Sequence, residues 1–148
     1  MKGPVKMNIL ACLTPKSEVS YITDDATLFK TLQTMQNGSY SAIPIINKKG
    51  RYVGTITAGD ILGCIKENFD LSIKESAKFP LKNIKRTRDY KAIGANTKFE
   101  GVINVAMDQN FVPVVDDDDN FIGILTRKEI LKWMHDKYNE EHPDGGKL

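Results

Sequence analysis

The chain contains one stretch of sequence twice: residues 42–62 read AIPIINKKGRYVGTITAGDIL, and residues 111–131 read FVPVVDDDDNFIGILTRKEIL. The two copies align without a gap at an offset of 69 positions, which places Pro44 on Pro113. Upstream, the match continues at an offset of 71, so the second copy has lost two residues before its proline strand. Such a repeat is typical of a repeated supersecondary unit, and we therefore expect two structurally equivalent halves.

Each copy is expected to form a strand, a helix, two strands and a second helix. In the first copy these elements are predicted over 19–22, from 28 to a stop at Asn37-Gly38, over 43–46 and 52–57, and from 59 to about 69. A unit of about 60 residues buries too little apolar surface to be stable alone. We therefore predict an α+β fold in which two pseudo-symmetric β-α-β-β-α repeats pack sheet to sheet.

The predicted organisation places a basic linker between the repeats. The first repeat is expected over 7–69, the linker over 70–88, the second repeat over 89–137 and a polar tail over 138–148. The end of the linker carries Lys82, Lys85, Arg86 and Arg88. A charge run of this kind is usually a solvated connector. Its alternatives are a phosphate clamp for the site at Asp60 or a docking surface for an acidic partner.

The composition excludes several classes of function. The 148 residues are 41% hydrophobic, and 21 Lys and Arg against 19 Asp and Glu give a net charge of +2. We therefore expect no nucleic-acid partner. The apolar runs are much shorter than the about 20 residues of a membrane-spanning helix, so no membrane association is expected. Cys12 and Cys64 are too few for a disulfide scaffold, and a cytoplasmic protein with reduced thiols is expected.

A threonine followed three residues later by an acid opens the second helix of each copy: Thr57 with Asp60, and Thr126 with Glu129. One interpretation is a capping box, in which threonine and acid each bond the backbone amide of the other. The other interpretation is a nucleotide site. A helix N-terminus presents free N–H groups and partial positive charge to a phosphate, and a carboxylate can accept hydrogen bonds from a ribose diol. Arg127 would add a charge-assisted phosphate contact.

These motifs resemble those of the cystathionine β-synthase (CBS) domain family, arranged as a tandem pair. The resemblance rests on the proline strands at 42–44 and 111–113, the Gly-x-x-Thr-x-x-acid motifs starting at Gly54 and Gly123, and the opening Leu13-Thr14-Pro15. It covers about residues 7–136. In layout the chain is similar to small stand-alone bacterial CBS-pair proteins.

The resemblance implies a regulatory module that senses an adenine nucleotide in the cleft between its repeats. The candidate ligands are AMP, ADP, ATP, S-adenosylmethionine and cyclic di-AMP. The resemblance also implies a homodimer and a partner protein that receives the signal.

CBS pairs build each nucleotide site from both copies, and the resemblance implies two such sites here. In the first, Tyr40 would stack on the base and Arg127 would bind a phosphate. Each site departs from the family pattern, because Glu129 replaces an aspartate and Gly94 stands where the first copy has Thr23. The aromatic ring and the arginine favour the first site, and which site is occupied stays open. The first site consists of Thr23, Tyr40, Ser41, Ala42, Ile43, Pro44, Thr126, Arg127 and Glu129, and the second of Thr57, Asp60, Ile93, Gly94, Asn110, Phe111, Val112 and Pro113.

The sequence offers no recognisable catalytic residues. It lacks a nucleophile–base arrangement, a phosphate-loop motif and an HExxH motif, so no enzymatic activity and no cofactor are expected. Residues 116–119 are four consecutive aspartates that align with the predicted hairpin turn at 47–50. Four adjacent carboxylates cannot all face one ion, so no metal site is expected. The alternative to a nucleotide sensor is a structural or protein-interaction module whose threonine–acid motifs only cap helices.

Overall fold

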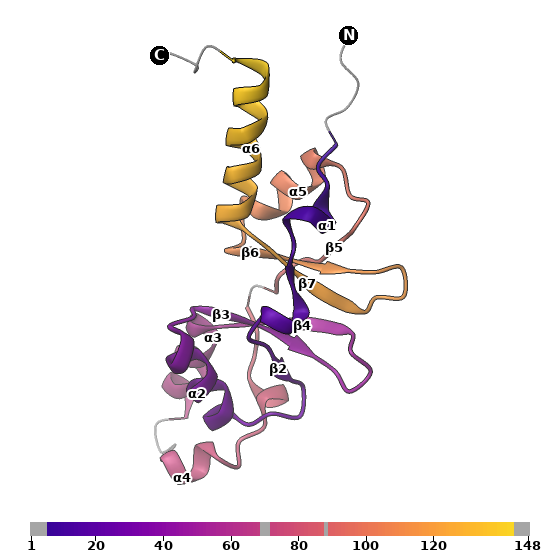
Figure 1. The fold of residues 1–148 in the computed structure, drawn as a ribbon. Helices are drawn as coiled ribbons and strands as arrows, with labels where there is room; N and C mark the ends of the chain where they lie inside the picture. Colours follow the sequence, from indigo (N-terminus) through magenta and orange to yellow (C-terminus); the bar gives the residue numbers. More distant parts are fainter. Residues whose placement is uncertain (1–5, 69–71, 88, 144–148) are drawn as a thin grey trace.

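The computed structural model describes residues 6–68, 72–87 and 89–143, and its order of elements confirms the predicted repeat (Figure 1). The first repeat consists of β2 (Ile22–Thr23), α2 (Leu28–Gly38), β3 (Ala42–Ile46), β4 (Tyr52–Thr57) and α3 (Ala58–Glu67). The second repeat consists of β5 (Ile93–Gly94), α5 (Phe99–Ala106), β6 (Phe111–Val115), β7 (Phe121–Thr126) and α6 (Arg127–Glu141). The fold is therefore of the predicted α+β class.

Short elements precede each repeat and pack against the other repeat of the same chain. They are α1 (Ile9–Cys12), β1 (Thr14–Pro15) and the 3-10 turn η1 (Lys16–Glu18) before the first repeat, and α4 (Ile73–Ser76) and the 3-10 turn η2 (Leu81–Asn83) before the second. β1 pairs with β7 of the second repeat, with Thr14 opposite Ile124. The first sheet has the order β2-β3-β4 and the second β1-β7-β6-β5. None of the helices in the described ranges is long and apolar enough to cross a membrane.

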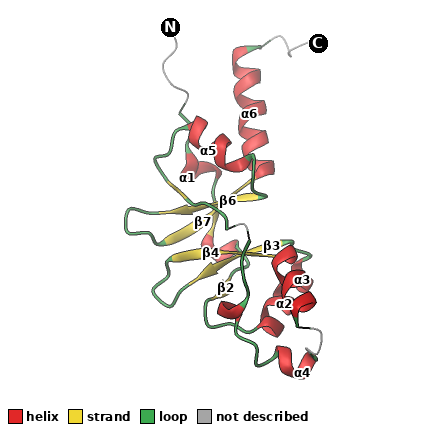
Figure 2. Cartoon of the chain, turned by 180° about the vertical axis from the view of Figure 1, so that it is seen from behind, coloured by secondary structure: helices red, strands yellow, loops and turns green. Residues whose placement is uncertain are grey.

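The two sheets face each other across a pseudo-twofold axis, with the helices on their outer sides (Figure 2). Equivalent residues of the two repeats touch across this axis: Ser41 bonds Asn110, Arg51 bridges to Asn120, and the ring of Tyr52 stacks on Phe121 at 6.3 Å. A pair of equivalent residues can meet only on the axis itself. The contacts therefore confirm the prediction that the repeats pack sheet to sheet.

Both hairpins turn in the same way. In the first, the side-chain oxygen of Asn47 accepts hydrogen bonds from the amides of Lys49 and Arg51 at 2.9 and 3.0 Å. In the second, Asp116 accepts from the amides of Asp118 and Asn120, each at 2.9 Å. These bonds lower the pKa of Asp116. The first aspartate of the acidic run is thus a turn residue, the aspartate counterpart of the asparagine in the first copy.

Each hydrophobic core is completed by the segment that leads into the other repeat. Leu81 and Ile84, which precede the second repeat, are buried in the first core. Met7 and Ile9, which precede the first repeat, are buried in the second core. The linker is therefore not only a solvated connector, because part of it supplies core residues.

Two sequence-based expectations need correction. The strand expected over 19–22 is wrong: β2 contains only Ile22–Thr23, paired in parallel with the end of β3. The ring of Tyr21 instead lies 6.3 Å from that of Phe121, so this segment is used for contact with the second repeat. The tail expected from residue 138 begins as helix, because α6 continues to Glu141.

Candidate functional site

The acidic residues at the N-termini of α3 and α6 form different hydrogen bonds. At α3, the Thr57 hydroxyl accepts from the amide of Asp60 at 3.2 Å, and the Asp60 carboxylate accepts from the amide of Thr57 at 3.0 Å. This is the complete capping box that the sequence predicts. At α6, Thr126 accepts from the amide of Glu129 at 3.1 Å, and the return bond is absent. The prediction of a second capping box is therefore wrong in that half.

The carboxylate of Glu129 does not accept a hydrogen bond from the amide of Thr126, although glutamate is well suited to a capping box. It acts instead on Cys12 of α1. There its negative charge adds to the effect of burial, which raises the pKa of the Cys12 thiol. The carboxylate of Glu129 has no hydrogen-bond donor among the described residues, and it remains free to accept bonds from a ligand.

The carboxylate of Asp60, in contrast, already accepts hydrogen bonds at both oxygens. The residue is only 4% exposed, and its second carboxylate oxygen accepts hydrogen bonds from both the amide and the hydroxyl of Thr87, each at 3.1 Å. Counting the capping bond to Thr57, three donors converge on this one carboxylate. The chain itself thus supplies the hydrogen bonds that a ribose diol was expected to supply.

The replacement Asp60→Asn is expected to lower the free energy of unfolding by about 1–3 kcal/mol, because the amide group turns a donor towards a buried N–H. Glu129→Gln, the matched change in the second repeat, breaks no internal hydrogen bond and should stay within about 0.5 kcal/mol. Urea unfolding of both variants measures the difference. Equal losses would contradict the distinction between the two helix ends.

The polar residues predicted to contact a base lie at the surface. Tyr40 is 44% exposed, and its hydroxyl accepts a hydrogen bond from Ser20 at 3.3 Å. Ser41 follows it, and its hydroxyl accepts from the side-chain amide of Asn110 at 3.3 Å. Thr23 lies at the end of β2 and donates to Asp25. These side chains are accessible to a ligand without a change in the core.

Other predicted residues are buried in the strands and offer a ligand only their backbone. Ala42, Ile43 and Pro44 form the buried start of β3. In the second repeat, Ile93, Val112 and Pro113 are buried, and the ring of Phe111 lies 5.0 Å from that of Tyr90, whereas Gly94 and Asn110 are exposed.

Strand register brings two residues of the first candidate site, one from each repeat, near each other. Phe111 is paired with Thr126, and its neighbour Asn110 is bonded to Ser41 of the first repeat. Ser41 and Thr126 therefore lie near the same edge of the paired sheets, as a site built from both copies requires.

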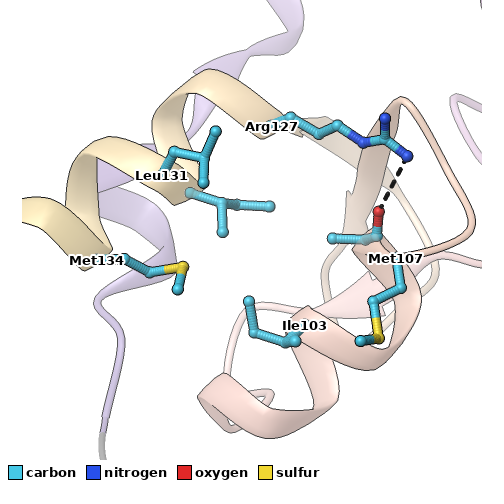
Figure 3. A pocket seen from close by; sticks show the side chains of 7 residues that line it. Ile103, Met107, Arg127, Leu131 and Met134 are labelled. Carbon is cyan, nitrogen blue, oxygen red and sulfur yellow. Dashed lines mark hydrogen bonds between the residues drawn. The ribbon is translucent and has the colours of Figure 1, made fainter.

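The side chain of Arg127 is directed at the C-terminal end of α5 and is not bonded to Tyr40 (Figure 3). Its guanidinium donates to the carbonyl oxygen of Ala106 at a long 3.4 Å (Figure 3). It borders an apolar cavity of about 360 Å³ whose other walls include Ile103, Leu131 and Met134. A bond of this length is weak, so a phosphate can displace it at small cost.

The sequence motifs did not indicate three residues at the second candidate site, which lie where the linker joins the second repeat. Besides Thr87, these are Asp89, whose carboxylate accepts from the amide of Thr55 at 2.8 Å, and Tyr90, whose carbonyl accepts from the hydroxyl of Tyr52 at 2.8 Å. Extending the offset of 71 through the linker aligns Asp89 with Glu18. By this alignment, the segment that contains Asp89 is the counterpart, in the second repeat, of the segment that precedes β2 in the first.

Two segments, residues 11–67 and 81–136, match the CBS domain family. The chain belongs to the CBS domain family. The two matches make it a tandem CBS pair, as the sequence predicts.

Several known proteins resemble this CBS pair in sequence or in structure. It is 27% identical over 138 residues to the 5'-AMP-activated protein kinase subunit gamma of Saccharomyces cerevisiae, covering 81% of this chain and 41% of that protein. A crystal structure of CbpB in complex with c-di-AMP superposes with a TM-score of 0.79 at 24% identity, covering 93% and 91% of the two chains. A CBS domain protein from Streptococcus pneumoniae superposes with a TM-score of 0.76 at 27% identity, covering 87% of each chain. The chain spans less than half the length of the first curated relatives that it matches.

Proposed function

We propose that this CBS pair is a regulatory module that binds an adenine nucleotide in the cleft between its repeats, at the site of Tyr40 and Arg127. It catalyses no reaction and passes the signal to a partner protein. The observation that carries the proposal is the unengaged end of α6, where Glu129 has no donor among the described residues and Arg127 has only a long bond to a carbonyl.

The chemistry of this end fits a phosphate and a ribose. The N-terminus of α6, a helix of 15 residues, supplies free amides and partial positive charge. Arg127 adds a charged donor, and the carboxylate of Glu129 accepts from sugar hydroxyls. Tyr40 supplies the aromatic face for the base, and Ser41 lies beside Asn110 at the joint edge of the sheets.

The comparisons support two kinds of adenine ligand. The relative in yeast belongs to an AMP-activated kinase, and CbpB was crystallised with c-di-AMP. Either ligand carries the base and the phosphate that this site would bind. Contact with both repeats would favour one relative orientation of the repeats over another, which is how binding can reach a partner.

Isothermal titration calorimetry of nucleotide-stripped protein tests the proposal. AMP, ATP, S-adenosylmethionine and cyclic di-AMP are titrated separately, and micromolar or tighter binding of one of them is expected. The same ligand should stabilise the fold by about 2.7 kcal/mol at a hundredfold excess over Kd. Failure of all four ligands to bind would favour the alternative, a structural or interaction module whose threonine–acid motifs only cap helices.

We also propose that the pair forms a homodimer through its outer helices. Leu62 of α3 and Leu131 of α6 are equivalent residues and are 66% and 63% exposed, and the equivalent Ile65 and Met134 are 42% and 40% exposed. The pseudo-twofold axis relates these two apolar faces. A second copy of the chain carries the same pair of faces and can cover both at once.

Leu131→Glu is expected to weaken the dimer at least about tenfold, because association would bury an unpaired carboxylate. Light scattering after size-exclusion chromatography, over a range of protein concentrations, measures the change. Lys132→Glu, on the next and differently oriented position of α6, is the control and should leave the dimer intact. A wild-type protein that is monomeric throughout would overturn the homodimer.

A further inference from the structure

We propose that the linker closes the second candidate site, that of Thr57 and Asp60, so that the chain offers one nucleotide site and not two. The expected stoichiometry rests on the proposed function, whereas the closure itself does not.

Thr87 binds the carboxylate of Asp60 in the way that a ribose would. Its amide and its hydroxyl both donate to the same oxygen of Asp60 at 3.1 Å. A ribose presents the same two donors, its vicinal hydroxyls, to the same acceptor. A nucleotide must therefore break both bonds to Thr87 before it can form its own, and it gains no additional hydrogen bonds at the carboxylate.

A second contact, made by the first residue of the second repeat, holds the end of the linker on the sheet. The carboxylate of Asp89 accepts from the amide of Thr55 in β4 at 2.8 Å, and Arg86 donates to its other oxygen at 3.2 Å. This carboxylate lies directly over Gly54, where an added Cβ would come within 2.6 Å of it. The linker thus approaches the strand as closely as a glycine permits.

The space left beside Asp60 is too small for a nucleotide. Asp60, Asn83, Lys85 and Thr87 line a cavity of about 100 Å³. Small-molecule sites usually measure about 300–1,000 Å³. A larger cavity of about 390 Å³ lies on the other side of this segment, against Asp89 and Tyr90. A nucleotide bound there can reach the Asp60 carboxylate only if Thr87 gives up its two hydrogen bonds to it.

The first candidate site has no equivalent closure. The offset that aligns the linker with the N-terminal segment places Lys16 at the position of Thr87 and Glu18 at that of Asp89. Lys16 lies over the ring of Tyr21, at 5.4 Å from its centroid. Among the described residues, nothing donates to the carboxylate of Glu129. The same segment of the repeat therefore covers one site and leaves the other open.

Amide hydrogen exchange, followed by NMR without nucleotide, tests the closure directly. The amides of Thr87 and Thr55 are expected to be protected in the wild type. Exchange at Thr55 should accelerate about tenfold or more in Asp89→Ala, because its acceptor is lost. Glu18→Ala, at the equivalent position of the first repeat, is the matched control and should change neither amide. Unprotected Thr87 and Thr55 amides in the wild type would overturn the closure, whether or not any nucleotide binds.

Calorimetric titration with AMP, and separately with cyclic di-AMP, tests the consequence. The wild type is expected to bind one ligand per chain, at the Tyr40 site, and the double variant Thr87→Val/Asp89→Ala should gain a second, independent binding event. Gly54→Ala displaces the Asp89 carboxylate by a different route and should show the same gain. A second event already present in the wild type, or absent from both opened variants while Thr55 exchanges freely, would overturn the inference. Loss of all binding in every protein would reject the proposed function and leave the exchange result to decide the closure.

Discussion

Gly123→Ala is expected to lower the free energy of unfolding by on the order of 3 kcal/mol. Gly123 has a φ of 155°, in a region that favours glycine. A Cβ there would lie 2.2 Å from the carbonyl oxygen of Thr14 and 2.9 Å from the Cγ of Leu13. The first of these atoms is backbone and cannot rotate away, so β1 must separate from β7.

Gly54→Ala at the equivalent position of the first repeat is the control. There the added Cβ would meet side-chain ends only, the carboxylate of Asp89 and the guanidinium of Arg86. These can move, so a loss of about 1 kcal/mol or less is expected. Guanidinium unfolding of both variants provides the comparison, and similar losses at the two glycines would show that β1 does not hold the second repeat.

Arg127→Ala is expected to reduce affinity for the nucleotide about 10- to 100-fold, the range for losing a hydrogen bond to a charged group. The fold should be unaffected, because among the described residues this guanidinium forms just the long bond to Ala106. Calorimetry gives the affinity, and thermal unfolding without ligand gives the stability.

Lys128→Ala separates a specific contact from general positive charge. Lys128 is the next residue of α6 and is exposed, so its loss removes the same charge from nearly the same place. Its affinity should fall much less, as expected for a screened surface charge. Equal losses in the two variants would mean that Arg127 acts through the field of the helix end and not through a bond to phosphate.

The repeat and its hairpins could be predicted because their signals are local. The proline strands, the turn at Asn47 and the threonine before α3 each specify their own structure within a few residues. The roles of Met7 and Leu81 could not be predicted in this way. Either apolar segment could complete either core, and only the geometry of the whole chain assigns each to the opposite repeat.

At the candidate sites, too, the local motifs could be predicted and the long-range contacts could not. The sequence identifies Thr57 with Asp60 as a motif, but it does not show that Thr87 has taken the acceptor, because the linker has no periodicity from which its path could be read. At Glu129 the box is only half formed, although the residue types suit a complete one. The spacing of residues alone does not distinguish it from the complete box.

The exchange of lead-in segments also sets an order of events during synthesis. The first core lacks Leu81 and Ile84 until the ribosome has passed the linker, so the first repeat cannot finish folding while only its own residues have emerged. Met7 and Ile9 leave the ribosome before either repeat and find their partners only after the strands of the second repeat are complete. The nascent chain therefore carries an unpaired apolar segment while both repeats are translated, and the step that buries this segment joins the two repeats into one cooperative unit.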